Sequence, residues 1–260
     1  MTATTTATST PTSANGSAAT AALPYTVPAM SPLYTPPPYH YSDGWSQLII
    51  FRSDPDVIGQ YVPAPLVADP AGTMTMMISR FFASGFGVYH EATLCALATF
   101  DGQVVNHPLY LALDSDIALG GGREIWGWPK KIGHIELAVR DGVVTTTVRR
   151  GGIELVRGAV EVGPLVSPDA LAGASMDFVN LKLVPSVTNG KPPEVAQLIK
   201  TSLSDFTAKR VYRGAATLSF GASPTDRFNQ FPVQEIVDAF YYNSDFTLGD
   251  GEVVHNYLAG

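Results

Sequence analysis

Residues 88–113 read VYHEATLCALATFDGQVVNHPLYLAL, and this stretch indicates how the chain folds. Two apolar runs rich in β-branched and aromatic residues flank the dipeptide Asp101–Gly102, which is a strong hairpin signal. The pattern recurs at Asp141–Gly142 and at Gly151–Gly152, each between further runs of the same kind. Hairpins at this density, with few helical patterns, predict an α+β protein that is mostly β. We expect an antiparallel, closed or nearly closed β-barrel core with a few peripheral helices.

The rest of the sequence predicts further strands and two short helices at the edges. Residues 54–63 favour one or two helical turns, because Asp54 suits the N-cap and Pro55 suits the first turn. The C-terminal stretch GEVVHNYL, residues 251–258, also reads as a helix. Further strands are expected over residues 46–54, 72–82, 176–185, 194–203 and 214–222.

The first 23 residues differ in composition from the remainder. They are almost entirely Thr, Ala, Ser, Pro and Gly, and they carry no charged side chain. We therefore expect a disordered tail over residues 1–30 and a single domain over residues 31–260. The basic start and apolar core of a secretory signal are both missing, which predicts a cytoplasmic protein. The proline-rich residues 25–41 are expected to lie extended along the domain.

Composition and motifs argue against several classes of function. The chain has 23 acidic residues against 16 basic ones and shows no basic stripe that would bind nucleic acid. It also contains no apolar run of 18 residues, so the sequence predicts no membrane-spanning helix. The five histidines lack the spacing of metal ligands, and the glycine run does not fit a dinucleotide-binding fingerprint. The apolar sequence around Cys95 predicts that this cysteine is a small, buried side chain. We expect neither a metal nor a cofactor. Charged residues make up only 15% of the chain, which favours a homo-oligomer.

The stretch GREIWGWPKK, residues 122–131, points to a reactive lysine. A proline limits the backbone before Lys130, while Trp126 and Trp128 supply apolar surface that disfavours a charged ammonium. A second ammonium on Lys131 would add repulsion. A neutral lysine amine attacks carbonyl carbons, so the combination is typical of a lysine that forms a Schiff base. The alternative is that both lysines start a strand, point to opposite faces and are solvated.

This stretch resembles the signature of the acetoacetate decarboxylase family, in which Gly-Arg-Glu precedes an aromatic-Pro-Lys-Lys element. Other stretches are similar to the family in the same order, over about residues 39–259: IIFRSDPDVIGQYVPAPL, GFGVYHEATL, LVPSVTNGKPPEVAQLIKTSLSDF and FNQFPVQEIVDAFYY. The resemblance implies the family's β-barrel. It also implies the family's known chemistry, in which a lysine activated by its surroundings forms an imine with a ketone.

The resemblance further implies catalytic roles for three residues. Lys130 falls on the Schiff-base lysine, Lys131 on the neighbour credited with activating it, and Glu91 on an active-site glutamate. Arg123 and Glu124 fall on the signature pair that precedes the lysines. We interpret these two as residues that orient the lysine segment.

Two positions depart from the family pattern. Gly44 stands where acetoacetate decarboxylases carry an arginine thought to meet the substrate carboxylate, and Met76 stands near their second active-site glutamate. Arg52 and Arg80 are candidates to replace the missing cation. The pocket should be larger and more apolar than one built for a four-carbon keto acid. The residues expected to contact the substrate are Trp126, Trp128, Met76 and Tyr241.

Three functions fit these features. The first is a lyase that uses a Lys130 Schiff base to decarboxylate a β-keto acid bulkier than acetoacetate. The second is an aldolase-dehydratase that acts through the same imine, for which Tyr241 or Tyr242 could donate protons. The third is a non-catalytic binder of apolar small molecules, although a binder has no need of two adjacent lysines beside an apolar wall.

Overall fold

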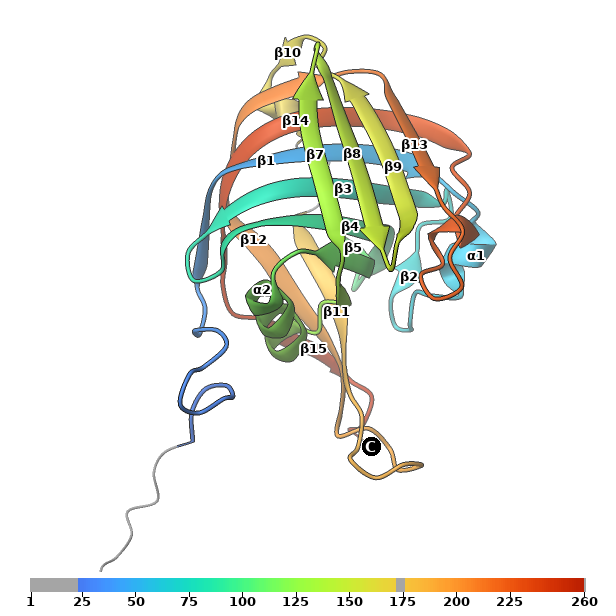
Figure 1. Cartoon of the computed structure of the whole chain (residues 1–260). Coiled ribbons are helices and arrows are strands. Elements are labelled where there is room, and N and C mark those ends of the chain that lie inside the picture. Colours follow the sequence, from blue (N-terminus) through green and yellow to red (C-terminus); the bar gives the residue numbers. More distant parts are fainter. Residues whose placement is uncertain (1–22, 172–175, 260) are drawn as a thin grey trace, which may run out of the picture.

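The structure is a computed structural model that describes residues 23–171 and 176–259 (Figure 1). Its main sheet curls into a ring of β4 (Gly87–Phe100), β3 (Thr73–Ala83), β1 (Tyr39–Arg52), β14 (Glu235–Leu248), β12 (Val195–Arg213), β11 (Asp177–Val184) and β5 (Gln103–Leu113), and β5 pairs back onto β4. Neighbouring strands are antiparallel except β11 and β5, which run parallel. The mostly β class and the nearly closed barrel expected from the sequence are confirmed.

Short elements extend the ring. β2 (Val67–Ala68) pairs with β4, β6 (Lys130–Ile132) pairs with β5, and both β10 (Leu165–Val166) and β15 (Glu252–Asn256) pair with β12. The helical elements are α1 (Pro55–Gly59), α2 (Asp116–Gly121), the π-helical turn η1 (Gly122–Trp126), and the 3-10 turns η2 (Pro168–Leu171) and η3 (Phe228–Gln230). Across the part of the chain that the structure describes, none of these helices has the length and apolar character to cross a membrane.

A second sheet lies across the outside of the ring. Its order is β13 (Ala216–Phe220), β9 (Ile153–Glu161), β8 (Val143–Arg150) and β7 (His134–Arg140), and Figure 1 shows β7 to β9 crossing β1, β3 and β14. The largest hydrophobic core fills the space between the two layers. It contains ring residues and second-sheet residues that are almost fully buried, among them Ile49, Met74, Met76, Leu94, Val148, Leu155 and Val160.

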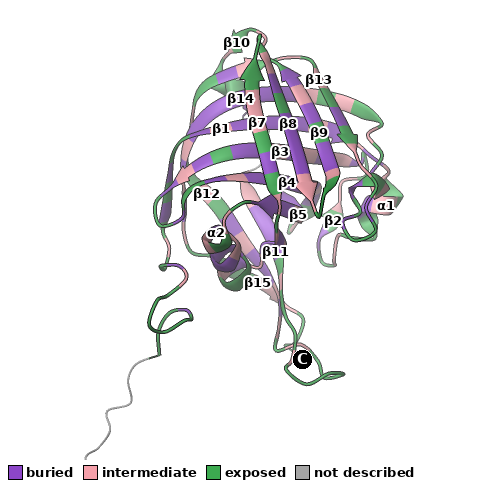
Figure 2. Ribbon diagram, in the orientation of Figure 1, coloured by how far each residue is buried: buried purple, intermediate pink, exposed green. Residues whose placement is uncertain are grey.

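The side chains of each ring strand point alternately into this core and into the ring interior. On β4, Ala92 and Leu94 belong to the core between the sheets, whereas Glu91, Thr93 and Cys95 line cavities inside the ring. Successive side chains of a strand point to opposite faces, so residues two apart share a compartment. Figure 2 shows buried positions along most of β1, β3 and β4. One face of these strands therefore packs in the core between the sheets, and the other faces the ring interior.

The predicted turns are confirmed. Both residues of the β4–β5 turn have positive φ, 48° at Asp101 and 74° at Gly102, as a tight hairpin of this kind requires. The β7–β8 turn repeats the geometry at Asp141–Gly142, and Gly151–Gly152 joins β8 to β9. The first predicted helix is also confirmed as α1, where the Asp54 side chain accepts hydrogen bonds from two backbone N–H groups.

The predicted C-terminal helix is wrong. Residues 252–256 form β15 on the edge of β12 instead. Val253 and Val254 are β-branched, which favours a strand over a helix. An isolated helix of this length would also be unstable, because nucleation is costly, whereas the neighbouring strand edge offers a ready ladder of hydrogen bonds.

The chain also enters the barrel earlier than the sequence predicts. β1 begins at Tyr39 rather than near residue 46, and Tyr39 is 1% exposed. Residues 1–22 of the expected tail lie outside the described residues. Further along, the Thr26 hydroxyl donates to Oε2 of Glu124 at 3.4 Å, and the Tyr34 hydroxyl donates to the same oxygen. The described part of the expected tail and the segment that follows it are thus bonded to η1.

Candidate active site

Lys130 reaches its position through a helix, a turn and a short strand. α2 runs directly into η1, which ends at Gly127 with φ of 77°. A Cβ at residue 127 would lie 2.4 Å from Cα of Lys182, so the turn requires glycine both for its conformation and for this close approach. The chain then forms β6, in which Lys130 lies opposite Leu111 of β5 in a parallel pairing. The lysine is therefore fixed to the ring by backbone hydrogen bonding.

The Lys130 amine is buried and lies against one carboxylate. Lys130 is 7% exposed and Glu91 is 8% exposed. The lysine Nζ lies 2.8 Å from Oε2 of Glu91, at angles outside the range of a hydrogen bond. The Thr93 hydroxyl donates to the other carboxylate oxygen at 3.5 Å. This arrangement places a proton acceptor beside the amine, and each charge compensates the other away from water.

The amine faces a small cavity inside the ring, which we name the lysine chamber. Its volume is about 40 Å³, enough for only a few ligand atoms. Its lining residues are Tyr41, Met77, Phe81, Tyr89, Glu91, Thr93, Trp128, Lys130, Phe178, Leu203, Phe246 and Leu248.

A larger cavity adjoins the lysine chamber, and we name it the apolar chamber. Its volume is about 140 Å³. Its lining residues are Leu48, Ile50, Thr73, Thr75, Met77, Thr93, Cys95, Leu97, Asn106, Leu171, Met176, Phe178, Leu203 and Tyr242. The residues common to both chambers are Met77, Thr93, Phe178 and Leu203. Within the described chain, the charged residues among these linings are Lys130 and Glu91.

Two tyrosines bring neutral proton donors to the lysine chamber. The hydroxyls of Tyr41 and Tyr89 lie 3.1 Å apart, and either can donate to the other. Burial is the main cause that raises the pKa of both phenols above the ordinary value, and the negative charge of the nearby Glu91 carboxylate raises it further. They therefore stay protonated at any working pH. One hydroxyl donates its hydrogen to the other, so the accepting hydroxyl keeps its own hydrogen available to donate to a different acceptor.

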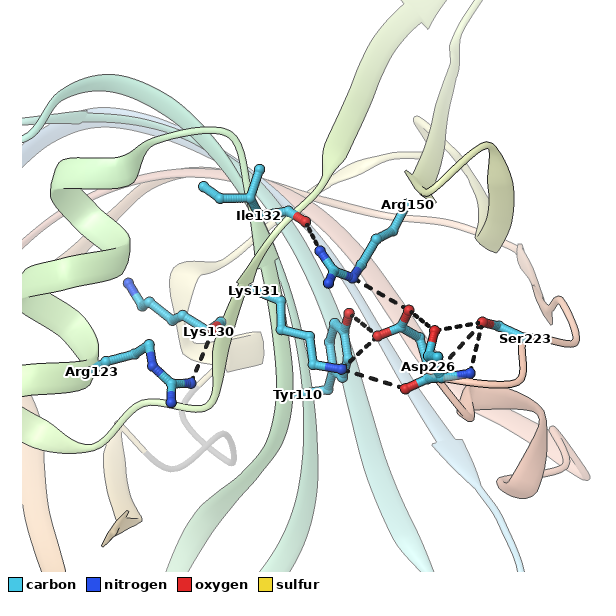
Figure 3. A network of polar contacts seen from close by, with 9 residues as sticks. Tyr110, Arg123, Lys130, Lys131, Ile132, Arg150, Ser223 and Asp226 are labelled. Atoms are coloured by element: carbon cyan, nitrogen blue, oxygen red, sulfur yellow. Dashed lines mark hydrogen bonds and ion pairs between the residues drawn. The ribbon is translucent and has the colours of Figure 1, made fainter. Parts of the chain in front are cut away.

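Lys131 lies on the other face of β6 (Figure 3). Its Nζ contacts the Asp226 carboxylate at 2.7 Å, and Asp226 also accepts a hydrogen bond from the Tyr110 hydroxyl at 2.8 Å and lies 3.4 Å from the Arg150 guanidinium. Burial alone would raise the pKa of Asp226, but hydrogen bonds from Lys131 and neighbouring hydroxyls outweigh burial and lower it. The expected ammonium beside the Lys130 amine is therefore absent, because strand alternation points Lys131 away and a counter-ion compensates its charge.

The glycine run before the motif makes room for the lysine. A Cβ on Gly122 would lie 2.6 Å from both Cδ and Cε of Lys130 and 3.0 Å from Nζ. Arg123, the next residue, donates from its guanidinium to the Lys130 carbonyl oxygen at 3.2 Å. Together these two residues set the path of the lysine, one by its lack of a side chain and the other by a hydrogen bond.

The space beside Gly44 belongs to an aromatic ring. A Cβ on Gly44 would lie 3.2 Å from the Phe81 ring, and Phe81 itself lines the lysine chamber. The two candidate replacements for a carboxylate-binding arginine lie elsewhere. Arg52 pairs with Asp69, and Arg80 is exposed with its guanidinium over the Phe82 ring. Neither arginine lines either chamber. Among the described lining residues, the positively charged side chain is Lys130 in the lysine chamber.

Three residues expected to contact the substrate lie outside both chambers. Met76 is fully buried in the core between the sheets, and its neighbour Met77 occupies the interior position instead. Trp126 packs against Tyr39 at 5.8 Å between ring centroids, because the turn at residue 127 directs only Trp128 into the chamber. Tyr241 stacks on a tryptophan on the other face of β14.

Sequence reasoning missed several chamber residues that strand alternation could have identified. Once Glu91 is placed inside the ring, a period of two also places Tyr89, Thr93 and Cys95 there. By the same rule Tyr242 is the interior tyrosine of β14, and its hydroxyl donates to Sδ of Met77 at 3.4 Å. In the described ranges, no group of His, Cys, Asp and Glu side chains is arranged to hold a metal ion.

The fold and the chambers together define a barrel protein with a buried amine facing an apolar cavity. A family model described as acetoacetate decarboxylase matches residues 22–258, so the chain belongs to the acetoacetate decarboxylase family. It is 30% identical over 240 residues to the acetoacetate decarboxylase of Ralstonia nicotianae, covering 90% of this chain and 96% of that protein.

Two solved structures share the fold. The acetoacetate decarboxylase of Legionella pneumophila has a TM-score of 0.84 at 24% identity, covering 88% of this chain and 92% of that one. The enduracididine biosynthesis enzyme MppR has a TM-score of 0.79 at 19% identity, covering 90% and 97%.

Proposed function

We propose that the protein is a lyase that forms an imine between Lys130 and a keto substrate. The observation that carries this proposal is the buried Lys130 amine, 2.8 Å from the Glu91 carboxylate and facing a chamber whose other described lining residues carry no charge. An ammonium cannot attack a carbonyl, so the lysine must lose a proton first. The Glu91 carboxylate, 2.8 Å from the nitrogen, is placed to accept that proton.

The proposed chemistry follows from the reactivity of the amine. The neutral amine adds to the ketone carbon, and the carbinolamine loses water to give a protonated imine. When the substrate is a β-keto acid, the bond to the carboxylate breaks, carbon dioxide leaves, and its electron pair forms an enamine. Protonation at carbon and hydrolysis of the imine then release the ketone and free Lys130. Glu91 lies beside the nitrogen and can return the accepted proton as the carbinolamine loses water, whereas the proton that adds to the enamine carbon comes from solution.

The lining of the chamber supports decarboxylation. Apart from the lysine, the described lining offers no cation to a substrate carboxylate, and neutral hydroxyls of Tyr41 and Tyr89 are the nearby polar donors. An anion in such surroundings is destabilised by several kcal/mol relative to water. Loss of carbon dioxide disperses that charge into the imine, so the transition state is less disfavoured than the bound anion. Because a firm carboxylate contact is missing, we also propose that the substrate is bulkier than acetoacetate and gains its binding energy from apolar groups.

A second candidate reaction uses the same imine. MppR, whose fold this chain shares, is known in complex with the condensation product of pyruvate and imidazole 4-carboxaldehyde. The Tyr41 and Tyr89 hydroxyls could donate protons to an aldehyde oxygen in a comparable aldol addition and dehydration. Tyr242 is a weaker candidate, because it lines the apolar chamber and not the lysine chamber, and its hydroxyl is already bonded to Met77.

Reductive trapping tests the imine directly. The protein is incubated with acetone and sodium borohydride, and intact mass and peptide mapping locate the adduct. We expect one adduct on Lys130 and none in Lys130→Ala. Equal labelling of the two proteins would refute the assignment. Absence of any adduct with acetone or a larger ketone would favour the non-catalytic binder. Carbon dioxide release, compared with condensation of pyruvate and an aldehyde, then separates decarboxylase from aldolase-dehydratase.

A further inference from the structure

The apolar chamber is too large and too close to the lysine to be only a packing defect. Its volume of about 140 Å³ is more than three times that of the lysine chamber. An apolar cavity of about 150 Å³ accommodates a benzene molecule. By contrast, the lysine chamber has room for the reacting carbons and little else. A substrate anchored at Lys130 can therefore place a group of about six carbons only in the neighbouring chamber.

The shared wall gives the route between the chambers. Met77 lines both of them, and its thioether accepts a hydrogen bond from the Tyr242 hydroxyl at 3.4 Å. A thioether is a weak acceptor on a flexible, unbranched side chain, so a ligand chain can displace it at little cost. Thr93 lies beside Met77 on the neighbouring strand, and Phe178 and Leu203 also line both chambers. The partition between the chambers is thus formed by side chains and not by backbone.

The lining of the apolar chamber specifies what it accepts. Among the described residues its lining carries no charged side chain, and its surface is dominated by groups such as Leu48, Ile50 and Leu97. Burial raises the pKa of Cys95, so this thiol behaves as a neutral, small apolar side chain. A carboxylate would be costly in this chamber, whereas an alkyl or phenyl group would bury its whole surface.

We infer that the apolar chamber is the subsite for the group on the far side of the substrate ketone. The substrate class is then a 3-oxo acid that carries an unbranched chain of about five carbons or a phenyl ring. Its ketone carbon lies at Lys130, its carboxylate stays in the lysine chamber, and its apolar group passes Met77. This inference rests on the proposed imine chemistry and adds to it a chain-length preference.

The preference has a calculable size. Each buried methylene favours binding by a factor of about four. 3-Oxooctanoate has four more methylenes than acetoacetate, so we expect its kcat/KM to be higher by on the order of a hundredfold. The preference should reach a plateau when the chain exceeds the chamber, and 3-oxododecanoate should gain nothing further.

The test combines a substrate series with a variant that fills the chamber. Carbon dioxide release is measured for acetoacetate, 3-oxohexanoate, 3-oxooctanoate and benzoylacetate, and acetone trapping at Lys130 is measured in parallel. Thr75→Phe places a phenyl ring in the apolar chamber, and we expect the ratio of kcat/KM for 3-oxooctanoate to that for acetoacetate to fall by at least tenfold. Thr75→Val has nearly the volume of threonine and should keep most of the preference. Ile50→Phe, with Ile50→Leu as control, repeats the test from β1 if Thr75→Phe does not fold.

The outcomes separate the subsite from the chemistry. Acetone trapping at Lys130 together with a flat substrate series in the wild type would overturn the subsite and leave the imine intact. A chain-length preference that survives both filling variants would also overturn the subsite. Absence of acetone trapping in the wild type would overturn the imine, and the substrate class with it.

Discussion

Replacing Gly122 by alanine should disable the lysine without unfolding the protein. The new Cβ would lie 2.6 Å from Cδ and Cε of Lys130, whereas ordinary contacts begin near 3.4 Å. The lysine side chain must therefore move by close to an ångström away from residue 122, which changes the position of its amine relative to the Glu91 carboxylate. A misplacement of about 1 Å at a reacting group can lower a rate by about a hundredfold. Alanine is also the better helix former by about 1 kcal/mol, so the helical segment itself gains stability.

The assay is the rate of acetone trapping at Lys130, with thermal unfolding measured on the same samples. We expect Gly122→Ala to be labelled about a hundredfold more slowly, with a melting temperature near that of the wild type. Gly120→Ala is the matched control from the same glycine run, because its Cβ would lie 2.6 Å from the end of the Leu33 side chain and in ordinary contact with the Tyr34 ring at 3.5 Å, and not against Lys130. Labelling of Gly122→Ala at the rate of Gly120→Ala would refute the idea that this glycine sets the position of the amine.

Four further predictions follow from the same contacts. Glu91→Gln should lower turnover by about 10² to 10⁴, because the variant loses the proton acceptor beside the amine; the final extent of acetone trapping should fall much less, because borohydride accumulates even a slowly formed imine, and loss of both to the same extent would contradict this role. Lys131→Met should change the trapping rate by less than about threefold, because Asp226 already compensates the Lys131 charge; a large fall would restore an electrostatic role for Lys131. The pKa of Asp226 is lowered on folding, so its contribution to stability is present above about pH 4 and is lost as the pH falls through the folded value. Asp226→Asn should therefore lower the melting temperature at pH 7 and flatten its decline between pH 5 and pH 3, and an unchanged acid profile in thermal unfolding would count against it. Light scattering at micromolar concentration should give a multiple of the 27.6 kDa chain mass, and a monomer would refute the homo-oligomer expected from the low charged fraction of the chain.

The barrel and the lysine could be predicted from the sequence because their signals are local. Turn dipeptides such as Asp101–Gly102 fix their hairpins with backbone geometry alone. The Pro-Lys-Lys element likewise marks a short segment whose residues are adjacent in sequence. The placement of Lys131 on the opposite face of β6 also matches one alternative open at the sequence level. That alternative also predicts that both lysines are solvated, and this part is wrong for Lys130, which is buried. The burial of Lys130 depends on its neighbours on β4 and β5, which the motif does not contain.

Whether each other residue that the sequence suggests for substrate contact lines a chamber depends on which face of its strand it occupies. Met76 and Met77 are identical in chemistry and adjacent in sequence, and only the pairing of β3 with β4 sends the second one inward. An alignment that is uncertain by a single residue therefore exchanges core and cavity. Trp126 and Trp128 would share one face on a regular strand, but a π-helical turn and a left-handed glycine separate them. The Tyr41–Tyr89 contact joins two strands that are distant in sequence, and no local signal announces it.

The ion pair of Lys130 and Glu91 constrains the charge of the described chamber lining at every stage of the proposed reaction. With Lys130 protonated and Glu91 ionised, the empty chambers are neutral, and a bound β-keto acid brings them to one negative charge. Forming the protonated imine leaves that total unchanged, since the positive charge passes from ammonium to iminium. Departure of neutral carbon dioxide also leaves it unchanged, now as a carboxylate beside a neutral enamine. Only uptake of a proton from solution returns the interior to neutrality, so each turnover should consume one proton, and an unbuffered solution purged of the released carbon dioxide should become more alkaline.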